Sequence, residues 1–139
     1  MVASHLQTLL GFDYGLKRIG IAVGQRITGT ASALCTISSG DDKPDWDSIS
    51  RIIGQWRPDA LVVGLPLHAD GSASEMSRSA LKFAHQLKAR YRLPVHTMDE
   101  RLSSHAAAEQ QRRDNTQGTG IDAIAARIIL QNWLETYDA

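Results

Sequence analysis

"LLGFDYGLKRIGIAVG", residues 9–24, contains two apolar runs joined by a short segment with a glycine at each end. The two runs are typical of neighbouring β-strands, and glycine permits a tight turn between them. Asp13 falls at the end of the first run, although Asp is depleted in strands and a buried charge is costly unless it is paired or binds a metal. The stretch therefore predicts the opening strands of a sheet and a carboxylate that needs an explanation.

The composition is that of an ordinary globular domain. The chain has 139 residues, of which 42% are apolar and 22% charged, so we expect one domain over residues 1–139 with its own core. Basic and acidic residues number 15 each, which disfavours strong non-specific binding to nucleic acid. A local groove that binds a nucleic-acid substrate is still possible, because salt screens charges beyond about 10 Å at 0.1 M. With Cys35 as its single cysteine and no signal or membrane segment evident, the chain is expected to be cytoplasmic.

The order of apolar patterns predicts an α/β fold. Three opening strands precede two alternations of helix and strand, and helices close the chain. We expect a mixed central sheet, flanked by helices, in which three antiparallel strands are joined by two parallel ones. The first strand is expected to lie beside residues 95–100. The predicted strands are 7–13, 18–24, 30–37, 60–65 and 95–100, and the predicted helices are 46–56, one starting near 73, 103–113 and 121–136.

Two of these helices carry further signals. Ser72 and Glu75 have the spacing of a capping box at a helix start. The helix that follows is expected to pack Met76, Phe83 and Leu87 on the sheet. In the last helix, the residues expected on the core side are Ile121, Ile124, Ala125, Ile128 and Ile129.

Three acidic residues lie at the edges of predicted elements within apolar surroundings: Asp13, Glu100 and Asp122. If the first strand lies beside residues 95–100, the three carboxylates meet. Three anions in one place repel one another, so such a cluster makes sense only with a cation. Oxygen ligands suit Mg²⁺ or Mn²⁺, and two such ions about 3.5–4 Å apart can activate water and stabilise a leaving phosphodiester oxygen.

Each carboxylate also has an ordinary structural explanation. Asp122 can complement the dipole of the helix that it begins, and Glu100 can pair with Arg101. Asp13 can cap the turn toward Gly15. Taken singly, these explanations compete well with metal binding, but together they are weaker, because the predicted sheet places all three residues at one end.

Basic residues beside the acidic ones are candidates for substrate binding. Lys17 and Arg18 lie in the turn that follows Asp13 and can contact phosphates, although a solvated hairpin tip is an equally good interpretation. Arg101 can hold the scissile phosphate, or it can form a structural ion pair with Glu100. His96, on a predicted strand, is interpreted as structural.

The chain resembles the YqgF family, also called RuvX, in four ordered motifs: "LLGFDYGLKRIGIAVG", "VVGLPLHADGS", "MDERLSS" and "IDAIAARIILQNWL". The resemblance covers roughly residues 7–136. It implies a ribonuclease H-like fold and a metal-dependent phosphodiesterase with Asp13, Glu100 and Asp122 as the acidic site. The substrate it implies is the 5′ end of pre-16S ribosomal RNA, in ribosome biogenesis, or the branched DNA of a Holliday junction.

The chain departs from the family pattern outside the acidic residues. Leu16 follows "DYG" where a small residue is common, and "LHADG" stands where "LNMDG" is common. The loop "NTQGTG" before Asp122 is short and lacks the usual Lys. These departures affect the expected contacts with substrate, while the acidic residues that the resemblance implies as metal ligands are retained.

Two other classes of function fit parts of the sequence. ATP-binding domains of the actin and sugar-kinase type also open with an Asp-x-Gly hairpin, but they need two such domains and have no use for Glu100 beside Asp13. A non-catalytic nucleic-acid-binding module would keep the fold without the intact acidic residues. We therefore expect a nuclease that acts on structured RNA, or on branched DNA, as a monomer or weak homodimer.

Overall fold

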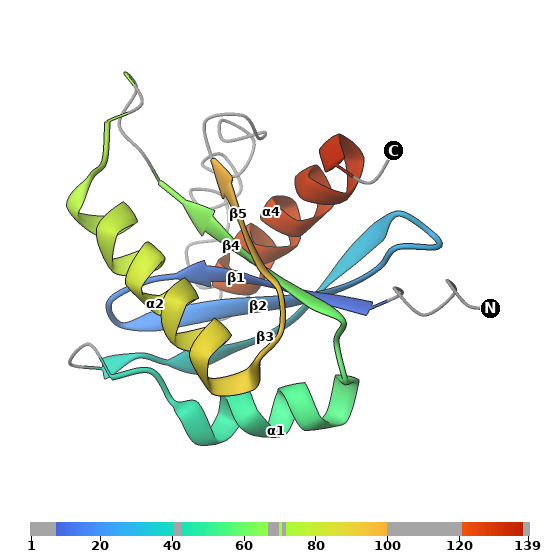
Figure 1. Cartoon of the computed structure of the whole chain (residues 1–139), viewed down its shortest axis with the longest axis horizontal. Coiled ribbons are helices and arrows are strands. Elements are labelled where there is room, and N and C mark those ends of the chain that lie inside the picture. The colour runs from blue at the N-terminus through green and yellow to red at the C-terminus, as the bar shows by residue number, and fades with distance from the viewer. Residues whose placement is uncertain (1–7, 41–42, 67–69, 71, 100–120, 138–139) are drawn as a thin grey trace.

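The computed structural model describes residues 8–40, 43–66, 70, 72–99 and 121–137. Their strands and helices, which are shown in Figure 1, follow the predicted order along the chain. The predicted helix at 103–113 lies outside the described residues. The elements are β1 (Thr8–Tyr14), β2 (Arg18–Gln25), β3 (Thr30–Ser38), α1 (Trp46–Trp56), β4 (Ala60–Leu65), α2 (Glu75–Tyr91), β5 (Val95–Asp99) and α4 (Ile121–Tyr137).

The five strands form one mixed sheet with the order β3-β2-β1-β4-β5. β1 pairs with β2, and β2 with β3, in antiparallel fashion, while β4 joins β1 and β5 joins β4 in parallel. The prediction of three antiparallel strands followed by two parallel ones is confirmed.

The expectation that β1 lies beside β5 is wrong, because β4 lies between them. Strands in a sheet are about 4.8 Å apart, so the backbones of β1 and β5 are separated by about 10 Å. The local apolar pattern indicates that a segment is a strand but does not specify its neighbours. The meeting of Glu100 with Asp13 therefore does not follow from strand pairing.

One face of the sheet is covered by α1 and α2. Leu10, Phe12 and Ile21 point to this face and pack with Ile49 of α1 and Phe83 of α2 in one buried cluster. The rings of Phe12 and Phe83 meet edge to face, with their centroids 5.6 Å apart. Phe83 and Leu87 are fully buried and Met76 packs against the cluster, as expected from the sequence.

The helix α2 begins two residues later than the sequence signal suggests. Its N-cap is Ser74, whose hydroxyl accepts a hydrogen bond from the backbone N–H of Ser77, and the Ser77 hydroxyl closes the capping box. Ser72 instead bonds to Asp70, both through its backbone N–H and through its hydroxyl. Ser72 and Ser74 lie close together and can each cap a helix, and the spacing of Ser72 to Glu75 predicted the wrong N-cap.

The opposite face of the sheet carries α4, on the other side from α2 in Figure 1. The glycines of β1 and β2 make this approach close. A Cβ atom added to Gly11 would lie 2.7 Å from the Cβ of Leu130, and one added to Gly24 would lie 2.9 Å from Leu130 Cδ2. Gln131 then fastens the β2–β3 turn, because its side chain accepts from the Ala31 N–H and donates to the Gly29 carbonyl.

The buried face of α4 differs from the prediction. Ala125 and Ile129 are buried as expected, but Ile124 and Ile128 are only half-buried. The face that meets the sheet is completed by Ala126, Leu130, Trp133 and Leu134. This helix has apolar residues on most of its sides. The glycines of β1 and β2 that it contacts, rather than its own sequence, therefore determine which of its faces is buried. None of the described helices is long and apolar enough to span a lipid bilayer.

Candidate active site

The sheet register places Asp13 on the same face as α4. Asp13 lies opposite Gly20 in the antiparallel pair of β1 and β2, and residues opposite each other in such a pair point to the same face. A Cβ atom added to Gly20 would lie only 1.8 Å from the carbonyl oxygen of Asp122. The Asp13 side chain therefore emerges beside the first turn of α4, which carries Asp122.

Gly20 makes this arrangement possible, because only a residue without a side chain lets the helix backbone rest on the strand here. Asp13 is half-buried, and the side chain of Asp122 is 20% exposed. Two carboxylates from opposite ends of the chain thus share one partly solvated corner of the fold. The position of Asp122 in the first turn also favours it electrostatically, because the helix N-terminus attracts negative charge.

Arg18 contacts this corner directly. Its Nε donates to Oδ2 of Asp122 over 2.8 Å, and its side chain remains 66% exposed. The Asp122 carboxylate therefore already binds one cationic group. An exposed ion pair of this kind contributes little to stability, about 0–1 kcal/mol, so Arg18 can exchange it for another partner at small cost.

Lys17 behaves differently from its neighbour. It is exposed, and its carbonyl oxygen accepts a hydrogen bond from the backbone N–H of Ser39, which ties the β1–β2 turn to the end of β3. The turn is therefore anchored at its backbone and presents one cation to Asp122 and a second cation to solvent.

The remaining predicted site residues, Glu100 and Arg101, lie outside the described residues. Within the described ranges no group of three His, Cys, Asp or Glu side chains is arranged to hold a metal ion. Asp13 and Asp122 are the two expected ligands that the fold brings to one place. Glu100 follows directly on Asp99, the last residue of β5.

The chemistry of these two residues fits Mg²⁺ or Mn²⁺. Both donors are carboxylate oxygens, which these ions prefer, and both reach the corner from elements of the packed core. The contact from Arg18 places a positive group where an ion would also be attracted. The described corner thus brings two carboxylates together beside an exposed arginine.

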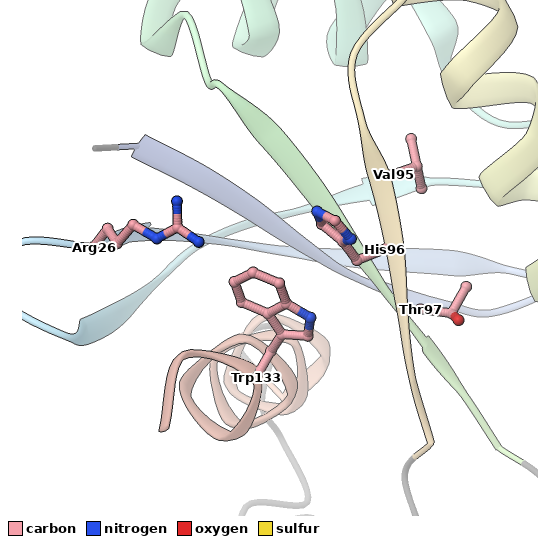
Figure 2. Close-up of a pocket in the computed structure, with 5 residues that line it drawn as sticks. All are labelled: Arg26, Val95, His96, Thr97 and Trp133. Atoms are coloured by element: carbon pink, nitrogen blue, oxygen red, sulfur yellow. The ribbon is translucent and has the colours of Figure 1, made fainter. Parts of the chain in front are cut away.

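A second concave feature lies on the same face, at the edge of the sheet. Arg26, Val95, His96, Thr97 and Trp133 line a hollow of about 660 Å³ (Figure 2). The His96 ring stacks on the Trp133 indole, with centroids 5.0 Å apart and an angle of 29° between the rings. Sequence reasoning missed this feature, because its residues come from three distant segments and match no motif.

Comparisons with known proteins agree with the observed fold and show the family of the chain. The model of the RuvX family, described as Holliday junction resolvase, matches residues 7–136. A protein from Pseudomonas putida named "Putative pre-16S rRNA nuclease" is 53% identical over 137 residues, covering 95% of this chain and 97% of the relative. A protein of the same name from Pseudomonas aeruginosa is 49% identical over 133 residues, covering 93% and 92%.

Two solved structures have the same fold. The RuvC protein of Thermus thermophilus, in complex with a Holliday junction substrate, aligns with a TM-score of 0.54 at 16% identity, over 92% of this chain and 93% of that one. The fowlpox virus Holliday junction resolvase aligns with a TM-score of 0.56 at 16% identity, over 93% and 99%. At this identity the likeness concerns the fold alone, and the predicted ribonuclease H-like architecture is confirmed.

Proposed function

Since this chain belongs to the RuvX family and is a nuclease like its named relatives, we propose that it cleaves precursor 16S ribosomal RNA with divalent metal ions held by Asp13, Glu100 and Asp122. The observation that carries the metal site is the contact of Gly20 with the backbone of Asp122, since Gly20 lies opposite Asp13. Glu100 enters the proposal as the residue directly after β5.

The roles of the residues follow from their charges. Two bound ions, Mg²⁺ or Mn²⁺, would supply an activated water and stabilise the charge that develops on the leaving oxygen. Asp13 and Asp122 hold positive charge at the corner between β1 and α4. Arg18, released from Asp122, is long and exposed enough to contact the scissile phosphate. Lys17 and Arg101 are the further residues assigned to phosphate contacts in this proposal. The site is contained in one domain that spans residues 1–139.

Ribosomal RNA is the first candidate substrate, because relatives that are about half identical over nearly the whole chain are named for it. Cleavage of Holliday junctions is the second candidate, favoured by the description of the matching family model. Symmetric resolution of a four-way junction needs two active sites, so it requires a homodimer, whereas trimming of an RNA end needs only a monomer.

The substrates can be separated in one assay. We expect purified protein with Mn²⁺ or Mg²⁺ to shorten a precursor 16S RNA at its 5′ end and to leave a four-way DNA junction intact. The same samples are examined by analytical ultracentrifugation, since a dimer that cuts junctions symmetrically would favour the second candidate. Failure to cleave either substrate with either metal would overturn the proposed function.

Arg18→Gln is expected to raise the affinity of the site for Mn²⁺ several-fold while it lowers the rate of cleavage. The substitution removes the cation that competes for Asp122, which favours the metal, and it also removes the group assigned to the phosphate. Isothermal titration calorimetry measures the first effect without any substrate, and single-turnover cleavage at saturating Mn²⁺ measures the second.

Lys17→Gln is the matched control for the metal titration. It removes the same charge from the neighbouring residue, which is exposed in the same turn. If both variants tighten Mn²⁺ binding equally, general electrostatics explain the effect and the ion pair is not a competitor. If Arg18→Gln weakens Mn²⁺ binding, Arg18 supports the position of Asp122 instead.

A further inference from the structure

The hollow beside β5 has the chemistry of a nucleotide-binding site. His96 is exposed, and one face of its ring stacks on Trp133. Trp133 belongs to α4 and is buried in the apolar cluster between that helix and the sheet. The imidazole is thus held in a fixed plane, which reduces the entropy lost when another ring stacks on it. Aromatic side chains fixed in this way serve as platforms for nucleic-acid bases.

A cation stands next to this platform. Arg26 follows directly on β2, and Figure 2 shows its side chain extending toward the His96 ring, with the Trp133 indole beneath. Partial burial of the ring, and to a lesser degree the charge of Arg26, lowers the pKa of His96, which favours the neutral ring. A neutral ring offers one donor and one acceptor to a base edge, and it leaves Arg26 as the positive group for a phosphate.

The register of the sheet gives the position of the hollow relative to the candidate active site. His96 is level with Val62 of β4, which is level with Gly11 of β1, two residues before Asp13. With about 3.3 Å per residue and about 4.8 Å per strand, the Cα atoms of His96 and Asp13 are about 12 Å apart. One strand that passes the candidate active site can therefore also reach the hollow.

We propose that this hollow binds one unpaired nucleotide of the substrate strand, with its base stacked on His96 and its phosphate held by Arg26. The inference rests on the proposed function for its ligand class, since a nuclease brings a strand to this face of the sheet. The hollow would hold a single-stranded segment in place while the phosphodiester bond is presented to the acidic residues.

The experiment measures binding without cleavage. A fluorescein-labelled single-stranded RNA of 12 nucleotides is titrated with the protein in EDTA, and its fluorescence anisotropy gives the Kd. We expect His96→Ala to weaken binding about tenfold, which is typical for the loss of one stacking platform. His96→Phe keeps a ring and should retain most of the affinity. Arg26→Gln should weaken binding and reduce the slope of log K against log salt concentration by about 0.7, the value for one lost phosphate contact.

Arg90→Gln is the matched control for Arg26→Gln. It removes the same charge from an arginine that also lies by a tryptophan, 4.0 Å over the Trp46 ring, but α2 places it on the other face of the sheet. Its Kd and salt slope should equal those of the wild type. Thermal melting of each variant verifies that the fold is intact, and Arg26→Gln changes only the head of a partly exposed side chain.

A second probe tests stacking directly. In a series of RNAs with one abasic position each, the wild type should lose about tenfold in affinity at one position, and His96→Ala should lose nothing further there. If the wild type does not bind the RNA, or if His96→Ala and Arg26→Gln bind as the wild type does, the subsite is wrong. If these variants bind weakly while the wild type cleaves neither substrate, the subsite stands and the proposed function fails.

Discussion

Asp13→Asn is expected to abolish cleavage and to leave the fold intact. Asn has nearly the same size as Asp and keeps one oxygen, so packing at the end of β1 hardly changes. In the proposed site, the substitution removes a negative charge that would hold the metal, and activation of water would depend on that metal. We expect kcat/KM to fall at least about a thousandfold, equivalent to about 4 kcal/mol of transition-state stabilisation.

Stability should move differently from activity in this variant. Without metal, the loss of one of two neighbouring negative charges relieves repulsion with Asp122, so the melting temperature should stay the same or rise. Nuclease assays with Mn²⁺ and thermal melting in EDTA measure the two properties. Asp47→Asn is the control, because it removes the same charge from the exposed first turn of α1.

Two results would contradict this account of Asp13. A clearly lower melting temperature for Asp13→Asn would mean that the carboxylate is a structural cap of the β1–β2 turn. Cleavage at the wild-type rate would mean that the active site lies elsewhere or that the activity came from a contaminant.

Gly20→Ala is expected to cause the largest loss of stability of any single methyl addition to the described sheet. The new Cβ would lie 1.8 Å from the Asp122 carbonyl oxygen and 2.7 Å from the Ala123 nitrogen, which are backbone atoms and cannot rotate away. The first turn of α4 must lift from β2, which disturbs its packing along the strand. We expect a loss of about 3 kcal/mol, seen as a melting temperature lower by about 12 °C.

Gly54→Ala provides the opposite control. Gly54 lies inside α1, and a Cβ atom added there meets nothing within 4 Å. Alanine should therefore stabilise the protein by about 0.5–1 kcal/mol, because glycine is the poorer helix former. If Gly20→Ala melts like the wild type, α4 does not rest on β2 as described, and the juxtaposition of Asp13 with Asp122 loses its support.

The boundaries of several elements could be predicted from the sequence because strong local signals mark them. The predicted strand 60–65 and the predicted helix 46–56 have the bounds observed for β4 and α1. A continuously apolar run after Pro58 leaves little choice for the first. For helix 46–56, the turn-rich segment before Trp46 marks the start. The spacing of Ile49, Ile52 and Ile53 indicates both the helix and its buried side.

Strand order and the buried face of α4 could not be predicted, because neither is encoded locally. Insertion of β4 between β1 and β5 depends on how two parallel crossovers pack, and the apolar runs of β4 and β5 fit either order. In α4, Ile124 and Ile128 looked like core residues by their chemistry. The surface that determines the buried face, however, is formed by Gly11 of β1 and by Gly20 and Gly24 of β2.

The sequence could predict only part of the candidate site, because contacts between distant segments are not encoded locally. Asp13 and Asp122 stood out because a charge at the edge of an apolar element is unusual, and the fold brings them to one corner. The ion pair of Arg18 with Asp122 joins residues 104 positions apart and could not be read from the turn alone. The place of Glu100 beside them remains a prediction.

The contact between Gly20 and Asp122 also has a consequence for the time at which activity arises. Ribosomes make the chain from its N-terminus, so all five strands emerge before α4 does. Until then, one face of β1 and β2 lacks its helix, and Asp13 lacks Asp122. A nascent chain still attached by this region would hold only part of the acidic set. The proposed nuclease activity would therefore begin only after α4 has left the ribosome and packed against β1 and β2.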